Sequence, residues 1–526
     1  MPTLEWIGKD KVVNHHQQVP YRVLERQYSY DEAGQHAEDN GSENMIIHGD
    51  NLEALKALLP RYEGKVKCIY IDPPYNTGNE GWVYNDNVND PKIKKWLGEV
   101  VGKEGEDLSR HDKWLCMMYP RLKLLQRLLA EDGVIFISID DTEFSYLRLI
   151  CDEIFKNFAE AIVWQKRTSP DARKKLSSGH EYVLIYTKNP DQNLVLKLLP
   201  LEGKDIEAYT NPDNDPRGPW ISSPFTAPGY RPNQMYQITT PTGKAILPPK
   251  GRCWCNIEEV YQRLLSEGRM WFGADGNGVP RRKTYLSERE GRGIWTWWTN
   301  SEVGYTQMAT QELAAILGKA VFDYPKPVRL VSRIIQMASS DGDIILDSFA
   351  GSGTTAHAVL NINKAKGGNR KFILVEMMDY ADSITAERVK RVIDGYGEGK
   401  KAVEGTGGNF IYYELGPVLL LPDGNLNEEV GPQKIREYVY YMETKEPLPA
   451  ELSAEEPYFM GLCRNTAYYF YYERESVTTL DHGFLATIQT KAEGYTIYAD
   501  LCAIPQETLR KYNITFKKIP RDIARL

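Results

Sequence analysis

The chain has 526 residues, with 64 Lys and Arg against 72 Asp and Glu and a net charge of −8. This length allows three or four domains of about 150 residues, and 42% hydrophobic with 26% charged residues excludes a disordered or fibrous protein. We find no apolar run of about 18 residues and no signal peptide at the start, so neither a membrane span nor secretion is expected. Seven scattered cysteines favour a reducing, cytoplasmic location. The acidic balance argues against nucleic acid as a partner unless basic residues are concentrated locally.

The first part of the chain predicts an irregular arm followed by a strand and a helix. Residues 1–43 are polar, and order is expected to begin with the short apolar strand 45–47. The periodic segment LEALKALL that follows predicts a helix that Asp50 or Asn51 caps. The run 66–71, rich in β-branched residues, predicts a second strand that ends at a pair of prolines.

Helices and strands continue to alternate up to about residue 163. Leucines at helical spacing occupy 115–129, where Pro120 is expected to start or kink the helix. A nearly continuous apolar strand is predicted at 134–139 and an amphipathic helix at 147–155. This alternation predicts an α/β domain with a mostly parallel sheet.

The α/β pattern is interrupted near Trp164 and resumes after residue 321. Residues 164–300 carry many turn signals and few helical periods. A helix around 328–335 and strands at 344–346 and 372–375 then follow. We therefore predict an N-terminal arm (1–43), one α/β domain in two parts (44–163 and 322–400), an inserted domain (164–321) and a C-terminal α+β region rich in tyrosine and acidic residues (401–526).

A glycine-rich turn follows the strand 344–346, in the segment DSFAGSGTT. Gly351 and Gly353 permit a tight turn and the close approach of a ligand, and the next helix offers free N–H groups. Glu376 ends the next strand, 23 residues beyond Gly353. A carboxylate at that place typically accepts hydrogen bonds from ribose hydroxyls, so the segment predicts a nucleotide-type cofactor.

The segment DPPYNTG, residues 72–78, has a different chemistry. Its two prolines fix the backbone and remove two N–H donors, which leaves carbonyl groups facing whatever lies beyond the strand. An exocyclic amine of a nucleobase is a poor nucleophile because its lone pair is conjugated into the ring. Acceptors on its N–H bonds, from Asp72 and the Pro73 carbonyl, would favour rehybridisation and stabilise the developing positive charge. Tyr75 would stack on an extruded base; a Pro-Pro turn that ends a core strand is the alternative.

DPPY together with a DxFxGxGTT loop resembles the amino-group DNA methyltransferases that use S-adenosylmethionine, and the motif order resembles their permuted β class. The resemblance covers most of residues 44–400 and includes segments 137–143, 180–188 and 322–330. The nearest subgroup is that of the modification subunits of type III restriction-modification systems, to which 516–523 is also similar. The resemblance implies a Rossmann-like methyltransferase sheet whose insertion is the target-recognition domain.

The resemblance also implies roles for individual residues. The catalytic residues are Asp72, Pro73, Pro74 and Tyr75. The cofactor-binding residues are Phe322, Lys326, Pro327, Asp347, Phe349, Gly351, Gly353, Thr354 and Glu376. Asp50 is added as an acidic residue of the cofactor pocket, with a role as a plain helix cap equally expected. The implied activity is transfer of a methyl group from S-adenosylmethionine to adenine N6 in duplex DNA after base flipping, in a restriction-modification or phage-defence system.

Several neighbouring activities remain as alternatives. Asp in DPPY, in place of the Ser of SPPY, favours adenine N6 over cytosine N4. Cytosine C5 methylation is set aside, because it requires a cysteine nucleophile after a proline and the chain contains no Pro-Cys. Methylation of RNA or of a protein glutamine is more distant, and the basic insertion disfavours a protein substrate.

The insertion carries the features expected of a DNA-binding region. Residues 164–300 have a net charge of +6, which leaves −14 for the rest of the chain, and they hold seven of the eleven tryptophans. Basic residues interleaved with aromatics suit phosphate contact and base stacking. The densest basic clusters, predicted to bind DNA, are Lys166, Arg167, Arg173, Lys174 and Lys175, and then Arg281, Arg282 and Lys283. For either cluster alone, a solvated loop is the alternative.

Further hypotheses concern partners and other classes of protein. Double-stranded DNA is the expected partner, and the resemblance adds a homodimer and a helicase-nuclease restriction subunit. A DNA-targeting subunit of a nuclease complex is an alternative function, supported by the acidic region 401–526. A dinucleotide-binding oxidoreductase would fit Gly351-x-Gly353-x-x-Ala356 but leaves DPPY unexplained. Cys253 and Cys255 have no second pair at zinc-like spacing, so no metal site is expected.

Overall fold

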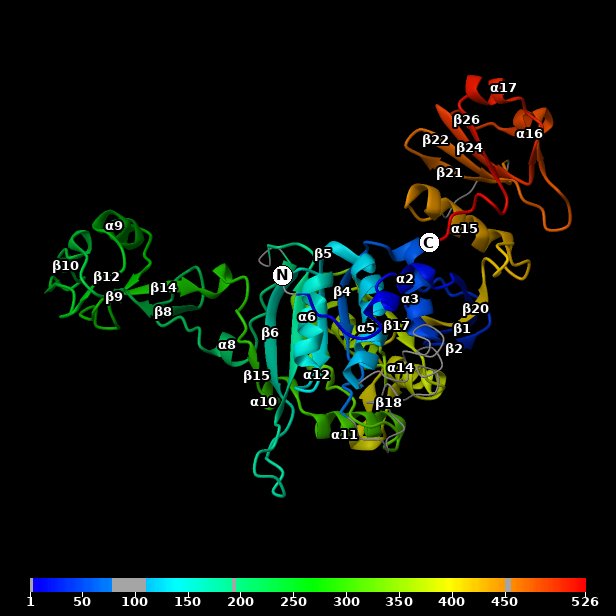
Figure 1. Ribbon diagram of the computed structural model, residues 1–526. Helices are drawn as coiled ribbons and strands as arrows, with labels where there is room; N and C mark the ends of the chain where they lie inside the picture. The colour runs from blue at the N-terminus through cyan, green and yellow to red at the C-terminus, as the bar shows by residue number, and fades with distance from the viewer. Residues whose placement is uncertain (1–2, 78–109, 192–194, 450–455) are drawn as a thin grey trace. The chain divides into compact units, whose positions relative to one another are not determined.

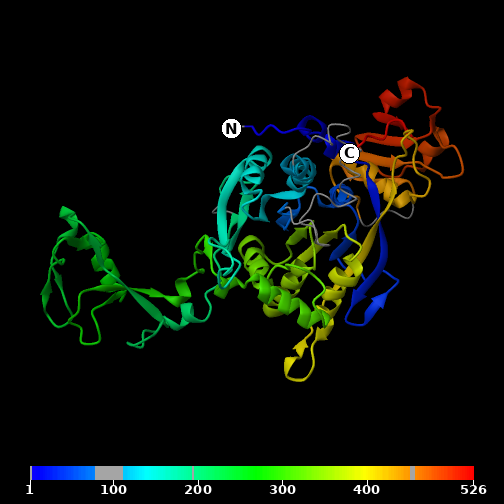
Figure 2. The same ribbon diagram turned by 60° about the horizontal axis from the view of Figure 1, so that its bottom comes forward.

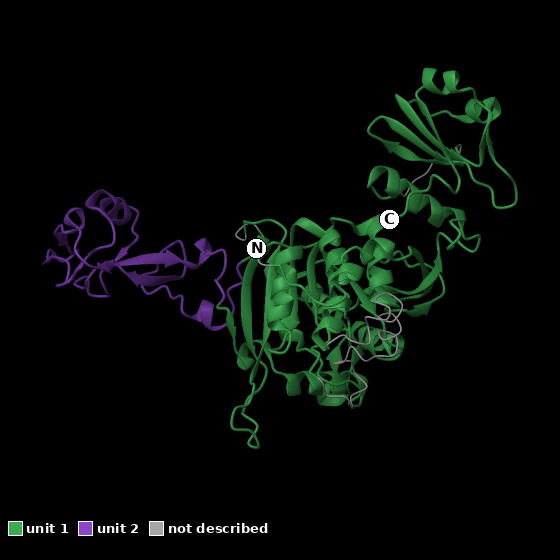
Figure 3. Cartoon of the chain, viewed as in Figure 1, with its two compact units in different colours: residues 1–197, 295–526 green, residues 198–294 purple. Residues whose placement is uncertain are grey.

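The computed structural model describes residues 3–77, 110–191, 195–449 and 456–526. The chain divides into two compact units, one formed by residues 1–197 and 295–526 and the other by residues 198–294 (Figure 3). Each unit is described by itself below.

An eleven-stranded sheet forms the centre of the larger unit (Figure 1). Its strands lie in the order β15 (Trp297–Trp298), β6 (Asn157–Gln165), β7 (His180–Thr187), β5 (Leu129–Ile139), β4 (Val66–Ile71), β16 (Ile344–Asp347), β17 (Lys371–Glu376), β3 (Met45–His48), β20 (Asn409–Val418), β1 (Arg22–Asp31) and β2 (Gly34–His36). Six consecutive strands of this sheet are parallel, in the order β5-β4-β16-β17-β3-β20. β7 and β1 run antiparallel to their neighbours. The predicted α/β fold with a mostly parallel sheet is therefore confirmed.

Helices cover both faces of this sheet because the central strands are apolar on both sides. Alternate side chains such as Ile69, Ile71 and Ile135 are buried in one core cluster with side chains of α3 (Asn51–Tyr62), α5 (Arg110–Leu128) and α6 (Phe144–Ile154). On the other face lie α12 (Val328–Ala338), α13 (Thr354–Lys366) and α14 (Glu387–Asp394), drawn in yellow-green in Figure 2. Pro120 lies inside α5 and not at its start. The remaining elements near this sheet are α10 (Asn300–Val303), α11 (Thr306–Leu317), the π-helical turn Ala381–Ala386, β18 (Gly395–Tyr396), η5 (Gly399–Lys401) and β19 (Val403–Glu404).

The N-terminal segment 1–43 is not the irregular arm that its polarity predicts. It forms α1 (Lys9–Val12), α2 (His15–Gln18) and the strands β1 and β2. β1 pairs with β20, where Tyr28 stacks on Tyr412 with ring centroids 5.0 Å apart. β20 also pairs with β3, so the sheet extends past the predicted boundary at residue 401. The local pattern could not reveal this, because β20, which pairs with β1, lies far from it in the sequence.

The compact insertion is narrower than the predicted range 164–321. β7 inserts between β5 and β6, and β15 pairs with β6, so both flanks of the range belong to the larger unit. The smaller unit, 198–294, packs a core that includes Phe225, Trp254 and Tyr261. Its elements are α8 (Lys204–Glu207), β8 (Trp220–Pro224), β9 (Thr226–Pro228), η2 (Pro232–Gln234), β10 (Ile238–Thr239), β11 (Ala245–Ile246), β12 (Arg252–Trp254), α9 (Glu258–Ser266), β13 (Met270–Trp271), β14 (Arg281–Tyr285) and η3 (Leu286–Glu288).

The last part of the chain adds a four-stranded sheet with its own core. The sheet has the order β21-β22-β24-β26, and the helix before it, α15, places Tyr441 in the core of the large sheet. The elements are α15 (Pro432–Thr444), β21 (Phe459–Cys463), β22 (Thr466–Phe470), β23 (Thr479–Leu480), α16 (His482–Thr487), β24 (Gly494–Ala499), β25 (Leu501–Cys502), α17 (Gln506–Lys511) and β26 (Ile514–Lys518). Within the described ranges, no helix has both the length and the apolar character needed to cross a membrane.

Candidate active site

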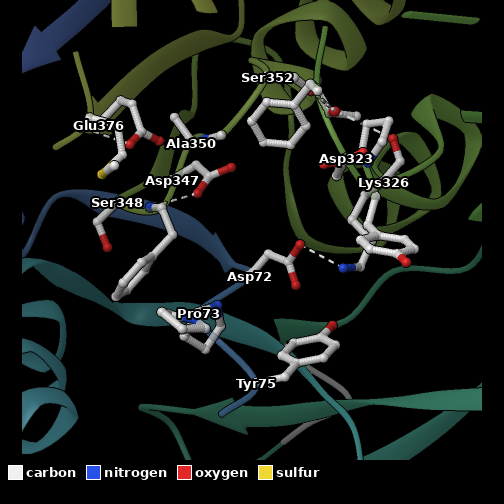
Figure 4. A pocket seen from close by; sticks show the side chains of 18 of the residues that line it. Asp72, Pro73, Tyr75, Asp323, Lys326, Asp347, Ser348, Ala350, Ser352 and Glu376 are labelled. Carbon is white, nitrogen blue, oxygen red and sulfur yellow. Dashed lines mark hydrogen bonds and ion pairs between the residues drawn. The ribbon is translucent and has the colours of Figure 1, made fainter. Parts of the chain in front are cut away.

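Three neighbouring strands of the large sheet end at the same edge. β4, β16 and β17 are parallel, and the residues at or just after their carboxyl ends are Asp72, Ser348 and Glu376. All three residues line one cavity of about 300 Å³, seen from close by in Figure 4. Ligands of open parallel sheets bind at this edge, so this cavity is the candidate active site.

The turn after β4 is held by contacts on the side away from the cavity. The indole N–H of Trp114 donates to the Pro74 carbonyl at 2.7 Å. Asn76 has a φ of 59°, and its amide donates to the Arg110 carbonyl at 3.1 Å and to the buried carboxylate of Glu143. These bonds fix the turn, so its cavity side presents Asp72, Pro73 and Tyr75 in fixed positions.

The carboxylate of Asp72 has two different oxygens. Oδ2 accepts a hydrogen bond from Lys326 Nζ at 2.6 Å, whereas Oδ1 is buried and accepts none from the described part of the chain. Burial raises the pKa of Asp72, and the charge of Lys326 opposes that rise. Figure 4 shows the Asp72 and Lys326 side chains pointing toward one another, with the ring of Tyr75 beside them. Lys326, predicted as a cofactor residue, therefore lies at the predicted catalytic motif.

A second buried carboxylate, Glu181 of β7, belongs to the same site and was missed by the sequence analysis. It accepts hydrogen bonds from the Tyr75 hydroxyl at 3.1 Å and from Lys166 Nζ at 3.0 Å, and it lies 3.7 Å from Lys326 Nζ. Burial alone would raise the pKa of Glu181, but Lys326 and Lys166 together bring the pKa below its ordinary value. The available signal was a carboxylate inside the otherwise apolar strand EYVLIY. Lys166, predicted to bind DNA, is instead mostly buried in this ion pair.

The glycine-rich loop after β16 is held by several hydrogen bonds. Asp347 accepts hydrogen bonds from Thr355 Oγ1 at 2.6 Å and from the Phe349 N–H at 3.1 Å, and burial raises its pKa to about 7. Gly351 has a φ of +52°, and a Cβ there would lie 3.1 Å from the Phe322 ring. Arg388 donates to Ser352 Oγ at 2.9 Å from behind the loop. A side chain at position 351 would fill the space that the cavity leaves at this loop.

The far end of the cavity carries groups suited to hydroxyls. Glu376 accepts hydrogen bonds from the Gly351 N–H at 2.7 Å and the Met378 N–H at 3.0 Å, and burial raises its pKa to about 7. Ser348 Oγ is buried and has no hydrogen-bond partner among the described residues. Because a carboxylate offers more lone pairs than two donors use, Glu376 can accept further hydrogen bonds here.

Most of the predicted site residues line the cavity. They are Asp72, Pro73, Pro74, Tyr75, Phe322, Lys326, Asp347, Phe349, Gly351, Thr354 and Glu376, whereas Asp50, Pro327 and Gly353 do not line it. Asp50 caps α3 by accepting from the Leu52 and Glu53 N–H groups and also contacts Arg121. Asn51, Arg121 and Asp140 line the cavity and were not predicted. Asn51 donates to the Ser348 carbonyl at 3.3 Å, a contact between distant segments that no local pattern indicates.

The predicted DNA-binding residues fall into different surroundings. Arg167, Arg173, Lys174 and Lys175 are exposed on the loop between β6 and β7, which belongs to the larger unit and extends beyond these strands in Figure 1. In the smaller unit Arg282 is exposed, and Arg281 donates to Ser222 Oγ at 2.7 Å. Lys283, also predicted to bind DNA, is buried and pairs with Asp213 and Asp215, so its ammonium group is not exposed to a phosphate in this structure. Alternate residues of β14 face opposite sides, which is why Lys283 is buried and Arg282 is not.

Comparison with known proteins identifies the family of the chain. A sequence model described as DNA methylase matches residues 66–387. The chain is 36% identical over 394 residues to the Mod subunit of the type III restriction-modification enzyme StyLTI of Salmonella typhimurium, covering 68% of this chain and 58% of that protein. It is 32% identical over 445 residues to the EcoP15I Mod subunit of Escherichia coli, covering 75% of this chain and 66% of that protein. The chain thus spans about three fifths to two thirds of these relatives.

Among solved structures, the PvuII DNA methyltransferase (cytosine-N4-specific) is similar with a TM-score of 0.33 and 15% sequence identity, covering 66% of this chain and 86% of that chain.

Proposed function

The chain belongs to the DNA methylase family, and from this premise we propose that it transfers a methyl group from S-adenosylmethionine to adenine N6 in duplex DNA. The observation that carries the proposal is that Asp72 of the DPPY turn and Glu376 of the cofactor strand line one cavity. A target base held at one end and a cofactor held at the other would then meet within it.

The residues at the glycine loop fit S-adenosylmethionine. Glu376 can accept hydrogen bonds from two ribose hydroxyls, and the buried Ser348 hydroxyl has no partner among the described residues and can meet a polar group of the cofactor. Gly351 leaves room that a Cβ would fill. When bound, the cofactor supplies an electrophilic methyl group on a sulfonium.

The DPPY end fits an exocyclic amine. Asp72 and the Pro73 carbonyl can accept hydrogen bonds from the two N–H bonds of the amine, and Tyr75 offers an aromatic face for the base. Acceptors fixed in this way stabilise the positive charge that develops on the attacking nitrogen, and one such interaction is worth about 3 kcal/mol. No covalent intermediate with the chain is required, so the main work of these residues is alignment and polarisation.

Aspartate at position 72 supports adenine over cytosine. A carboxylate in this motif accompanies adenine in the methyltransferases that the sequence resembles, and the catalytic carboxylate keeps a buried oxygen, Oδ1, without a donor in the described chain. Cytosine N4 would present the same kind of amine and is the alternative that the experiment below separates.

We further propose that residues 198–294 and the exposed loop between β6 and β7 contact the DNA, with Arg167, Arg173, Lys174, Lys175, Arg281 and Arg282 as contributors. Phosphate contacts of this kind set affinity and register but do not read the sequence. The recognition sequence is therefore a property to be measured.

The test is sequencing with modified-base detection of DNA from cells that express the chain, together with mass spectrometry of the nucleosides. We expect N6-methyladenine at one short sequence, and none when Asp72 is replaced by Ala. N4-methylcytosine in place of N6-methyladenine would support the alternative, and unmodified DNA would contradict both.

The similarity to type III Mod subunits supports a role in the cytoplasm beside a restriction subunit. We propose that the chain modifies DNA and also delivers such a partner to it. Copurification from the native host tests this role, and light scattering of the purified protein tests whether it forms a homodimer. If deletion of residues 456–526, which leaves β20 and α15 in place, removed the partner but left methylation intact, the four-stranded sheet near the end of the chain would be its attachment site.

A further inference from the structure

The ammonium group of Lys326 lies where the amine of a target base would have to bind. We propose that Lys326 is a placeholder, a side chain that occupies the amine position at Asp72 until a base arrives, and that Glu181 receives Lys326 when the base binds. This inference rests on the proposed function, since it assumes that Asp72 and Tyr75 hold an extruded base.

The contacts of Lys326 are those that the base itself needs. Its Nζ donates to Asp72 Oδ2 at 2.6 Å and lies 4.9 Å from the centroid of the Tyr75 ring. An adenine stacked on Tyr75 with its amine on Asp72 would therefore meet the lysine head group. Figure 4 shows the Lys326 head group beside the Asp72 carboxylate, with the Tyr75 ring close to both.

Charge also requires the lysine to leave before methyl transfer. While Lys326 donates to Asp72, its positive charge offsets the negative charge of the carboxylate. Methyl transfer develops positive charge on the attacking nitrogen, which an unpaired carboxylate stabilises and a neighbouring ammonium opposes. While Lys326 is paired with Asp72, it thus occupies the position of the base amine. Once Lys326 has left Asp72, the carboxylate can stabilise the reacting nitrogen.

Glu181 is well placed to receive the displaced ammonium. Its Oε2 lies 3.7 Å from Lys326 Nζ, so a small movement of a flexible side chain converts this contact into a direct ion pair. Lys166 and the Tyr75 hydroxyl already hold the Glu181 carboxylate in position. The lysine thereby stays paired throughout, which avoids a buried and uncompensated charge.

The structure also provides room for this movement. A second cavity of about 620 Å³ adjoins the first, and Lys326 and Glu181 line both. The other residues common to the two cavities are Lys166, Arg167, Asp323 and Tyr324. The Lys326 side chain can therefore turn from the Asp72 side to the Glu181 side without displacing a packed core.

The experiment compares two duplexes that share the recognition sequence and differ only at the target, which is adenine in one and an abasic site in the other. Their affinities are measured by fluorescence anisotropy with saturating S-adenosylhomocysteine, in mildly alkaline buffer that keeps Asp72 ionised. The readout is the adenine advantage, the ratio of the Kd for the abasic duplex to the Kd for the adenine duplex. This ratio cancels the general loss of DNA affinity that removal of a positive charge causes.

We expect Lys326→Met to raise the adenine advantage about tenfold, because the base no longer competes with the ammonium. Glu181→Gln should lower it by a similar factor, since the displaced lysine then loses the charge of the Glu181 carboxylate that would receive it. The double variant should return to within about twofold of Lys326→Met, because without the lysine the loss of Glu181 matters little. A purely structural role of Glu181 would leave the double variant as poor as Glu181→Gln.

Lys364→Met and Glu404→Gln serve as matched controls, since they remove an exposed lysine–glutamate pair with a 2.9 Å contact. Neither control should change the ratio. If Lys326→Met lowers the adenine advantage or leaves it unchanged, Lys326 stays on Asp72 during binding and the placeholder role is wrong. A wild-type protein that methylates no adenine overturns the proposed function and this inference with it, whereas an active wild type with the wrong ratios overturns the inference alone.

Discussion

Two largely shielded lysines, one in each compact unit, contact the same kinds of groups but have different roles. Lys326 lies near Asp72 and Glu181 and over the ring of Tyr75, and Lys283 lies near Asp213 and Asp215 and over the ring of Trp220. Both side chains are mostly shielded from solvent. The residue types alone do not separate the two sites.

The difference lies in how fully the carboxylates are occupied. Asp215 accepts hydrogen bonds from Lys283 at 2.9 Å, from Arg217 at 2.9 Å and from the Tyr285 hydroxyl at 2.7 Å. Asp72 keeps one buried oxygen that accepts no hydrogen bond from the described residues, and it faces a cavity. A carboxylate whose oxygens all accept hydrogen bonds stabilises the unit that contains it. A carboxylate that faces a cavity with one oxygen lacking a donor can accept a hydrogen bond from a ligand.

The largest expected effect comes from Asp72→Ala. Methyl transfer should fall by about 10³-fold or more, because the variant removes an acceptor aimed at the developing charge. The fold should persist, because Lys326 keeps Glu181 as a counter-ion. Incorporation of labelled methyl groups into DNA measures the first result and thermal unfolding the second. Appreciable methylation of adenine by this variant would contradict the role assigned to Asp72.

Asp215→Ala should have the opposite effects on activity and stability: it should lower stability more than it lowers methyl transfer. It removes the carboxylate that accepts hydrogen bonds from the side chains of Arg217, Lys283 and Tyr285, which should destabilise residues 198–294 by about 2 kcal/mol. Hydrogen exchange of β14 (Arg281–Tyr285) should become faster, and in Asp72→Ala it should stay as in the wild type. If β14 exchanged its amide hydrogens at the same rate in the wild type, Asp72→Ala and Asp215→Ala, the proposed difference between Asp72 and Asp215 would be wrong.

Glu376 should make cofactor affinity depend on pH. Burial raises the pKa of Glu376 to about 7, so below that pH it is protonated in the free protein and becomes a weaker acceptor for ribose hydroxyls. The Kd for S-adenosylhomocysteine should fall as pH rises, by at most about tenfold per unit, and level off above pH 7. Calorimetry across this range measures the dependence.

Two variants identify the carboxyl group that causes the pH dependence of cofactor affinity. Glu376→Gln should bind more weakly with a flat profile. Asp347→Asn should keep the dependence, because its carboxylate, with a pKa also raised to about 7 by burial, bonds to Thr355 and Phe349 within the loop. If the Kd of Asp347→Asn did not depend on pH, the titrating group would be Asp347 and not Glu376.

The smallest effect is expected at the surface. Replacing Arg173, Lys174 and Lys175 by Ala should weaken binding to duplexes of every sequence alike and lower the salt dependence by about 0.9 per lost phosphate contact. Anisotropy titrations at several salt concentrations measure both. The exposed Lys400 and Lys401 supply a control pair whose replacement should change neither quantity. Loss of affinity for one sequence alone would mean that this loop reads bases.

The parts of the site that lie close together in the sequence were predictable. The turn Asp72–Tyr75 and the loop around Gly351 each combine a strand, an unusual turn and a chemical requirement within a short segment. Parallel strands end at one edge of a sheet, which places both segments at that edge, whereas only the structure shows that β4 and β16 are neighbours. The predicted strands at 66–71, 134–139 and 372–375 all lie in the sheet.

Contacts between distant segments were not predictable from one sequence. Glu181 reaches the catalytic turn because β7 inserts antiparallel into the sheet, and β1 is ordered because it pairs with β20. Lys166 and Lys283 belonged to predicted DNA-binding clusters, yet both are held in ion pairs. Local charge patterns do not report which side of a strand is covered.

The sequence by itself determined the chemistry that the site can carry: an acidic Pro-Pro-Tyr turn, a glycine loop and an acidic strand end on a parallel α/β sheet. The tertiary structure decided which charged side chains are available for that chemistry. The physical reason is that the use of a carboxylate or an ammonium depends on burial and on the number of donors and acceptors around it, and distant segments of the chain supply both. In this protein the hydrogen bond from Lys326 to Asp72 can be exchanged for one from a base, whereas side chains of its own unit use the hydrogen-bonding capacity of Asp215.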